Sequence, residues 1–233
     1  MREVRDRNRK IGLGLMGVHE WLLQRGYSYE VTPELKQWLE VYRDESERAA
    51  REHCDRFYIS HPKKFRAVAP AGTLSILAST TSGIEPLFAV AYKRRYLVDG
   101  TKWRFQYVID STAKRLIEEY GVSPERIETS YSLASRPEQR IKFQADIQDY
   151  VDLGISSTIN LPEWGTELNN EDTCKELSNS ILKYSHRLRG ITCFPSGSRG
   201  FQPLTEVSYE EAIHNEGIVF AEENTCSGGV CGI

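Results

Sequence analysis

The chain has 233 residues, enough for one large domain or two small ones. A net charge of −3 gives no basic footprint for nucleic acid, and the sequence contains no apolar run of about 18 residues that would predict a transmembrane helix. Five cysteines at irregular spacing favour a reducing compartment over a secreted disulfide framework, so a cytoplasmic protein is expected.

Two helices and a strand are predicted in the first part of the chain. Apolar residues at helical spacing predict a helix over 11–25, with three glycines allowing close packing. Thr32 followed by Pro33 is the usual order of a cap residue and a first-turn proline, so a second helix is expected from there to about Phe57. A short strand is expected over 65–68.

The rest of the chain alternates between the two kinds of element. In chain order we expect a strand over 89–98, an amphipathic helix over 104–120, a helix over 137–150, a buried strand over 156–162, a helix from Asp172 to Leu188, and a strand over 191–194. Strands that alternate with helices indicate an α/β fold. We expect a domain over 1–203, followed by a flexible tail over 204–233.

The segment Pro70-Ala71-Gly72-Thr73-Leu74-Ser75 is a candidate phosphate site. A loop of small residues before a helix exposes backbone N–H groups, and the helix dipole adds partial positive charge there. Thr73 and Ser75 add hydroxyl donors. The segment lacks the P-loop pattern, and a tight turn that binds nothing is the alternative.

The last eight residues carry Cys226 and Cys231 on a glycine-rich tail. Gly228 and Gly229 let the chain fold back so that the two sulfurs can meet. A bond that closes so short a loop stabilises little, which favours a carrier of reducing equivalents. Half of a zinc site or two unrelated thiols are the alternatives, although zinc wants four ligands.

Other polar residues give weaker signals. Glu85, between Ile84 and Pro86, is a candidate buried carboxylate, with a solvated turn glutamate as the favoured alternative. The five histidines show no metal-ligand spacing. Of the remaining cysteines, Cys54 is expected to be structural, and Cys174 and Cys193 are expected to be isolated buried thiols.

Five segments in this order form a recognisable set: 9–17 (RKIGLGLMG), 69–86 (APAGTLSILASTTSGIEP), 157–162 (STINLP), 190–199 (GITCFPSGSR) and the terminal C-x4-C. The set resembles the C-terminal part of the large catalytic chain of ribonucleotide reductase. It is most similar to the adenosylcobalamin-dependent class II enzymes, and to their triphosphate-reducing branch. The resemblance covers nearly the whole chain.

The resemblance implies a fold, a cofactor and roles for particular residues. The fold would be the C-terminal half of a ten-stranded α/β barrel, shared with pyruvate formate-lyase-like enzymes. The loop Ala71, Gly72, Thr73, Leu74 and Ser75 would bind the phosphates of a ribonucleoside di- or triphosphate. Cys226 and Cys231 would reduce the active-site disulfide and then be reduced by thioredoxin or a similar dithiol. The assembled enzyme would use adenosylcobalamin.

Two departures from the family pattern shape the hypotheses. The segment 192–195 lacks the adjacent tyrosines of class I large chains, which favours cobalamin over a diiron partner. An Asn-x-Cys-x-Glu-like motif for the thiyl-radical cysteine is absent from these residues. We therefore expect an enzyme fragment that is inactive alone and assembles with an N-terminal reductase chain. A non-catalytic nucleotide-binding or thiol-exchange remnant and a class I fragment are the alternatives.

Overall fold

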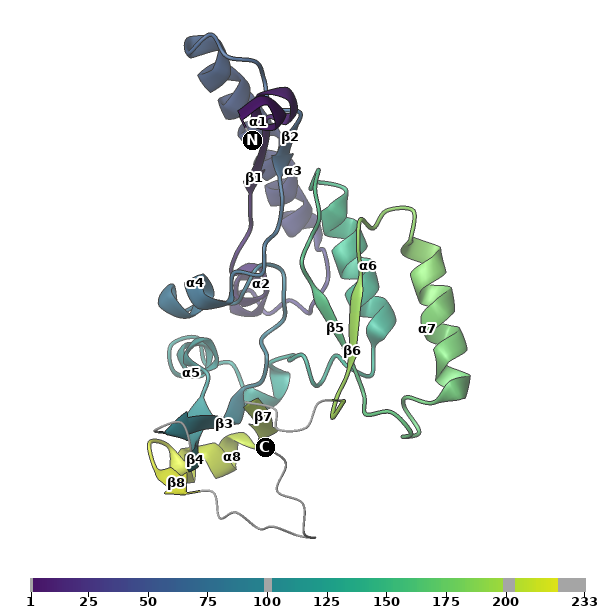
Figure 1. Ribbon diagram of the computed structural model, residues 1–233. Coiled ribbons are helices and arrows are strands. Elements are labelled where there is room, and N and C mark those ends of the chain that lie inside the picture. Colours follow the sequence, from purple (N-terminus) through teal and green to yellow (C-terminus); the bar gives the residue numbers. More distant parts are fainter. Residues whose placement is uncertain (1, 99–101, 199–203, 222–233) are drawn as a thin grey trace.

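The protein is described by a computed structural model that covers residues 2–98, 102–198 and 204–221. It confirms the predicted α/β class. Helices and strands alternate in the order α1 (Arg2–Asn8), β1 (Lys10–Leu13), α2 (Val18–Gln24), α3 (Pro33–Arg56), β2 (Lys64–Arg66), α4 (Gly72–Leu77), β3 (Ala91–Val98), β4 (Lys102–Ile109), α5 (Ser111–Glu118), α6 (Pro137–Gln148), β5 (Thr158–Leu161), α7 (Glu171–Tyr184), β6 (Thr192–Pro195), β7 (Leu204–Val207), α8 (Tyr209–Asn215) and β8 (Val219–Ala221), with a 3-10 turn at Pro124–Arg126 (Figure 1).

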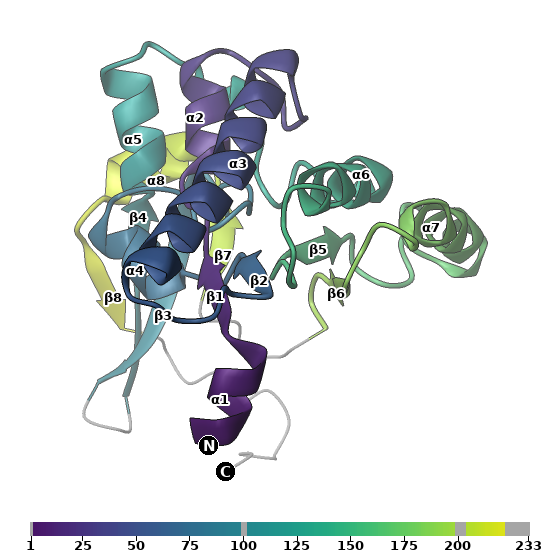
Figure 2. The same ribbon diagram turned by 90° about the horizontal axis from the view of Figure 1, so that it is seen from above.

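Four short strands form a parallel wall. β1 pairs with β2 and β5 pairs with β6, both in parallel. A parallel bridge between Val68 and Ile155 joins the two pairs. The helices α3, α6 and α7 all lie on one side of this wall (Figure 2). Parallel strands with helices on one face form an open portion of an α/β barrel, which confirms the expected half-barrel.

The main core lies between the wall and its helices. α2, α3 and α6 contribute Leu22, Leu39 and Ile147, each at most 2% exposed. Tyr29 and Phe143 pack ring against ring at 4.0 Å between centroids. Full burial of each large apolar side chain stabilises the fold by about 1.5–3 kcal/mol. These contacts fix α2 and α6 against the segments that carry the candidate site.

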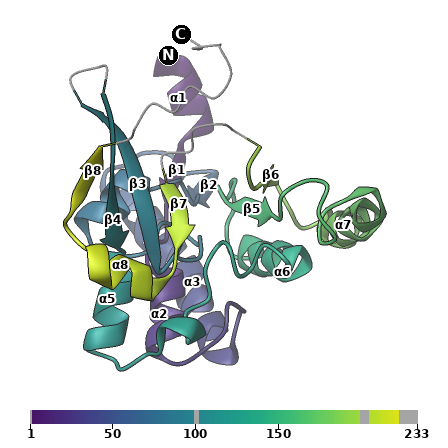
Figure 3. The same cartoon turned by 90° about the horizontal axis from the view of Figure 1, so that it is seen from below.

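A separate antiparallel sheet has the order β7-β3-β4-β8. The hairpin β3–β4 pairs over eight residue positions, and the later strands add to its two edges (Figure 3). α8 closes one face, because Ala212 packs against Ala91 and Ile109 with almost no exposure. The sheet therefore joins segments that lie about a hundred residues apart.

The predicted helix over 11–25 is wrong in its first half. Residues 10–13 form β1, and the helix begins only at Val18, after Gly17 with φ of 75°. A Cβ at Gly12 would lie 3.2 Å from the Cβ of Ala67. The glycines therefore let β1 lie close to the chain beside it, and Ala67 N–H donates to the Leu13 carbonyl at 3.1 Å. These glycines were expected to let a helix pack closely. In the structure they instead let two strands lie close together.

The predicted helix over 104–120 is also wrong over its first half. Residues 102–109 form β4, and Asp110 caps α5 by accepting from the N–H groups of Thr112 and Ala113. The apolar residues of this segment also alternate, and pairing with β3 selects the strand. By contrast, α3, α6, β3 and β5 confirm the predicted elements to within a few residues at their ends.

The predicted tail contains structure. β7, α8 and β8 occupy 204–221, so a tail that starts at 204 is wrong over these residues. The sequence signal was present but short: Ser208 caps α8 by accepting from the N–H of Glu211 at 3.1 Å. Residues 222–233 lie outside the described part of the chain. Among the described helices, none combines the length and apolarity needed to span a bilayer.

Candidate functional site

The candidate phosphate loop follows Val68, whose bridge to Ile155 joins the two halves of the parallel wall. Val68 donates its N–H to Gly154 at 3.2 Å and accepts from Ser156 N–H at 2.8 Å. The chain is therefore fixed just before the loop, in line with the carboxyl end of β2. The next residues, 69–71, lead directly into α4.

The start of α4 presents unpaired donors. Ala71 occupies the N-cap position and forms no side-chain cap hydrogen bond. The N–H groups of Gly72, Thr73 and Leu74 precede the first intrahelical bonds, and within the described residues they have no acceptor. A Cβ built on Gly72 would meet nothing within 4 Å. A row of free N–H groups that faces open space suits an anion.

The two hydroxyl residues of the loop differ in orientation. Thr73 is exposed, so its hydroxyl is available to a ligand. Ser75 is 5% exposed and its Oγ donates to the Gly72 carbonyl at 2.8 Å. Of the two hydroxyl donors expected from the sequence, only that of Thr73 faces outward. Ser75 instead stabilises the first turn of α4.

Glu85 is a paired carboxylate. Its Oε2 accepts from Arg140 Nη2 at 2.8 Å, and its Oε1 accepts from Thr158 N–H at 2.6 Å. The Arg140 side chain is only 1% exposed and also donates to the Thr158 carbonyl at 2.6 Å. The favoured expectation of a solvated turn glutamate was therefore wrong. The pair attaches the segment after the candidate loop to the start of β5.

His19 lies deeper, on α2. It is fully buried, and its Nδ1 accepts from Leu87 N–H at 2.9 Å. Burial, with a smaller contribution from the charge of Arg140, lowers the pKa of His19 to about 3. The ring is therefore neutral, and its role is to position the chain after Glu85.

The described cysteines are free thiols in separate places. Cys54 is buried in α3, Cys174 is exposed on α7 and Cys193 is half-buried in β6. The expectation of a buried thiol is therefore wrong for Cys174, because its position on α7 faces solvent. Burial raises the pKa of Cys193, which lowers its thiolate fraction at neutral pH. The described residues contain no group of three or more His, Cys, Asp or Glu side chains that could hold a metal ion. Cys226 and Cys231 lie outside the described residues.

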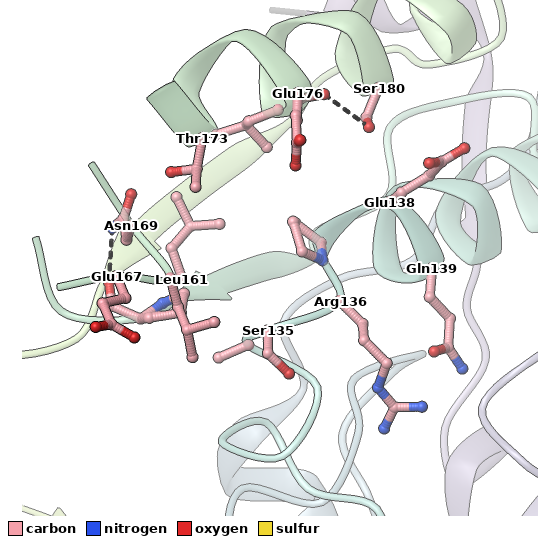
Figure 4. Close-up of a pocket in the computed structure, with 15 residues that line it drawn as sticks. Ser135, Arg136, Glu138, Gln139, Leu161, Glu167, Asn169, Thr173, Glu176 and Ser180 are labelled. Atoms are coloured by element: carbon pink, nitrogen blue, oxygen red, sulfur yellow. Dashed lines mark hydrogen bonds between the residues drawn. The ribbon is translucent and has the colours of Figure 1, made fainter. Parts of the chain in front are cut away.

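A hollow of about 430 Å³ lies between α6 and α7, apart from the candidate loop. Thr173 and Glu176 of α7 face Leu161 and Ser135 across it (Figure 4). Its lining includes three glutamates, and Arg136, the cation among the described lining residues, is paired with Glu128 at 2.8 Å. Carboxylates repel phosphate, so this hollow suits a nucleotide less well than the open start of α4.

Sequence reasoning missed a polar cluster behind α4. Glu20 of α2, Thr80 and Arg115 of α5 are joined by hydrogen bonds although they are far apart in the sequence. A lone glutamate and a lone arginine on amphipathic helices resemble ordinary surface charges. Only the fold brings them together.

Comparison with known proteins identifies the family of this fold. The family model for the ribonucleotide reductase barrel domain matches residues 61–194. The chain is 27% identical over 257 residues to a vitamin B12-dependent ribonucleoside-diphosphate reductase of Mycobacterium tuberculosis (strain CDC 1551 / Oshkosh), with 96% of this chain and 36% of the relative covered. A putative adenosylcobalamin-dependent ribonucleoside-triphosphate reductase of Mycobacterium phage D29 is 28% identical, with 100% and 38% covered.

Solved structures show the same fold. A B12-dependent class II ribonucleotide reductase matches with a TM-score of 0.69 at 15% identity, over 91% of this chain and 34% of that one. The α subunit of the Actinobacillus ureae class Id reductase matches with a TM-score of 0.57 at 16% identity, over 84% and 40%. The chain thus spans little more than a third of the length of the curated relatives named here. It belongs to the ribonucleotide reductase family, and residues 61–194 are part of the barrel domain.

Proposed function

We propose that this chain supplies the substrate-phosphate loop and the reducing tail of a ribonucleotide reductase, which converts ribonucleotides to deoxyribonucleotides for DNA synthesis. The observation that carries the proposal is the row of free N–H groups at Gly72, Thr73 and Leu74, at the carboxyl end of a strand in a reductase barrel domain. Ligands of parallel sheets bind at that end of the strands.

The loop would hold the substrate by its phosphates. Three backbone N–H groups and the Thr73 hydroxyl would donate to phosphate oxygens, so binding would depend on the phosphates rather than on the base. Diphosphate and triphosphate substrates both present such oxygens. Ala71 and Gly72 have little or no side chain, which leaves room for close approach.

The tail would restore the active site by thiol–disulfide exchange. A thiolate of Cys226 or Cys231 attacks a sulfur of the active-site disulfide, and the second tail thiolate then displaces that sulfur from the mixed disulfide. Two electrons and two protons pass from the tail dithiol to the active site. The tail disulfide is then reduced by thioredoxin or a similar dithiol.

The remaining parts of the enzyme would come from residues outside this chain. An N-terminal reductase chain would supply the thiyl-radical cysteine and close the barrel. Adenosylcobalamin would supply the radical when bound. A pocket buries most of the surface of its ligand, and half of a barrel wall cannot enclose a group as large as a corrin. The described residues therefore do not fit the cofactor by themselves.

Reconstitution tests the proposal. The chain is assayed for ribonucleotide reduction with adenosylcobalamin and a small dithiol, alone and with a candidate N-terminal reductase chain. Activity only in the mixture supports a two-chain reductase. Activity with a diiron subunit in place of cobalamin would favour class I chemistry. Folded protein without activity in any mixture would favour a nucleotide-binding or thiol-exchange remnant.

The tail has its own test in the active mixture. Cys226→Ser or Cys231→Ser should abolish turnover with thioredoxin and leave turnover with a small dithiol that reaches the active site directly. Cys174→Ser, at an exposed cysteine of α7, is the matched control and should leave both activities unchanged. Equal losses with the two reductants would refute the shuttle role.

A further inference from the structure

We infer that Glu20, Arg115 and Thr80 form a clamp that positions the substrate-phosphate loop; this inference rests on the proposed function of that loop. The clamp joins α2, α5 and the chain just after α4. It holds the chain at the opposite end of α4 from the loop, so its members act as positioning residues.

α4 is weakly held by its own side chains. It has six residues, and its apolar residues Leu74, Ile76 and Leu77 are 62%, 79% and 83% exposed. A short helix gains most of its stability from packing, and here only Ser75 is buried. The direction of its free N–H groups must therefore be set largely by what holds the two ends of α4.

The clamp holds the end that follows the helix. Glu20, whose side chain is 8% exposed, accepts from Thr80 Oγ1 at 2.5 Å and from Arg115 Nη2. The same Arg115 nitrogen donates to the Ser79 carbonyl at 2.9 Å. One carboxylate and one guanidinium thus fix two consecutive residues after α4.

Further backbone bonds connect the clamp to the helix itself. Thr80 N–H donates to the Ser75 carbonyl at 2.9 Å, so the position of Thr80 determines the last turn of α4. On the other side, Thr81 accepts from Gly17 N–H at 2.8 Å through its carbonyl and from Glu20 N–H at 3.3 Å through its Oγ1. α2 is part of the buried core. The clamp therefore fixes the position of the loop relative to a rigid element.

The clamp bonds to a residue with a strained backbone, and this is why its loss should weaken substrate binding. Ser79 has φ of 51°, a left-handed conformation that a non-glycine residue adopts only when its surroundings impose it. Arg115 bonds to the carbonyl of that residue. Without the clamp the turn can relax, α4 can tilt, and the N–H groups of Gly72–Leu74 lose their common direction.

Two readouts test the inference in the reconstituted enzyme and in the chain. Arg115→Gln and Thr80→Val should raise the KM for cytidine 5′-diphosphate roughly tenfold to a hundredfold with a much smaller change in kcat. They should also speed amide hydrogen exchange over 72–80 without nucleotide. Thr80→Ser keeps the hydroxyl and should behave as the wild type.

Arg187→Gln is the matched control. Arg187, just after α7, is a similarly half-buried arginine that pairs with Asp146 of α6 at 2.8 Å. Among the described residues it makes no bond to α4 or its flanking turns. In the Arg187→Gln variant, the KM for cytidine 5′-diphosphate and the amide hydrogen exchange over 72–80 should be unchanged. An equal rise in KM for this variant would show a general loss of structure and would overturn the clamp.

A variant within the loop separates the two hypotheses. If Thr73→Val raises KM while Arg115→Gln and Thr80→Val do not, the loop binds phosphate and the clamp is refuted. If Thr73→Val also leaves KM unchanged, the proposed phosphate site itself fails. If Arg115→Gln does not fold, the two Thr80 variants test the clamp by themselves. Thr80→Val replaces the hydroxyl with a methyl, whereas Thr80→Ser keeps the hydroxyl and loses the methyl.

Discussion

Acidification should destabilise this protein through one buried histidine. His19 is fully buried, and its Nδ1 accepts a hydrogen bond from Leu87 N–H. A proton on Nδ1 would set two N–H groups against each other, and within the described part of the chain Nε2 has no hydrogen-bond partner to share a charge. The His19 pKa of about 3 in the folded protein expresses this cost.

The size of the effect follows from linkage. Unfolded histidine has a pKa of about 6.5, so below that pH the unfolded chain binds a proton that the folded chain refuses. The contribution is fully present above pH 6.5 and is lost progressively as the pH falls toward about 3. Its slope approaches about 1.4 kcal/mol per pH unit, so about 2 kcal/mol should be lost between pH 8 and pH 5.

His19→Asn isolates this contribution. Asparagine keeps an acceptor for Leu87 N–H but does not titrate, and it loses the edge contact between the imidazole and Tyr29. The variant should be less stable at high pH, and the difference in free energy of unfolding from the wild type should shrink by about 2 kcal/mol on going to pH 5. Urea unfolding followed by circular dichroism measures both. A difference independent of pH would refute the reasoning, because the other histidines are present in both proteins.

Two further predictions concern the Glu85–Arg140 ion pair and the Cys193 thiol. Arg140→Ala leaves Glu85 without its buried partner and should cost about 3–5 kcal/mol in urea unfolding. Adding Glu85→Gln should recover part of that loss, and strictly additive losses would contradict the coupling. Cys193 should react with iodoacetamide more slowly at neutral pH than a free cysteine, because burial raises its pKa. Its rate should rise only at more alkaline pH, and a rate equal to that of free cysteine at neutral pH would contradict the burial argument.

Local signals predicted the elements whose packing agrees with their pattern. Thr32 with Pro33 marked the start of α3 correctly, and Thr32 accepts from Leu35 N–H. The strand over 89–98 was predicted nearly to the residue. Errors arose where a pattern was compatible with two structures. The glycine-rich segment at 11–17 and the apolar segment at 104–109 each fitted a helix. In the structure, pairing with β2 makes residues 10–13 a strand, and pairing with β3 makes residues 102–109 a strand.

The candidate site was likewise predictable from the sequence only in part. The loop could be proposed as a candidate because Ala71–Ser75 combine small size, hydroxyl groups and a helix start within a few residues. Its support was not identifiable, since Glu20, Thr80 and Arg115 are separated by up to 95 positions and carry no shared local pattern. The same applies to Glu85 and Arg140, whose pairing depends on how α6 packs against the wall.

The pairing of β8 with β4 limits how far from the sheet the two tail cysteines can lie. Phe220 stacks on Phe105, so the chain is anchored to the sheet up to Ala221. From that root, Cys226 is five residues away and Cys231 ten, and an extended chain spans about 3.3–3.6 Å per residue. The backbone of Cys226 can therefore lie at most about 18 Å from Ala221, and that of Cys231 at most about 36 Å. The proposed shuttle role therefore requires that both the disulfide to be reduced and the docking surface of the electron donor lie within that distance of the edge of one small sheet.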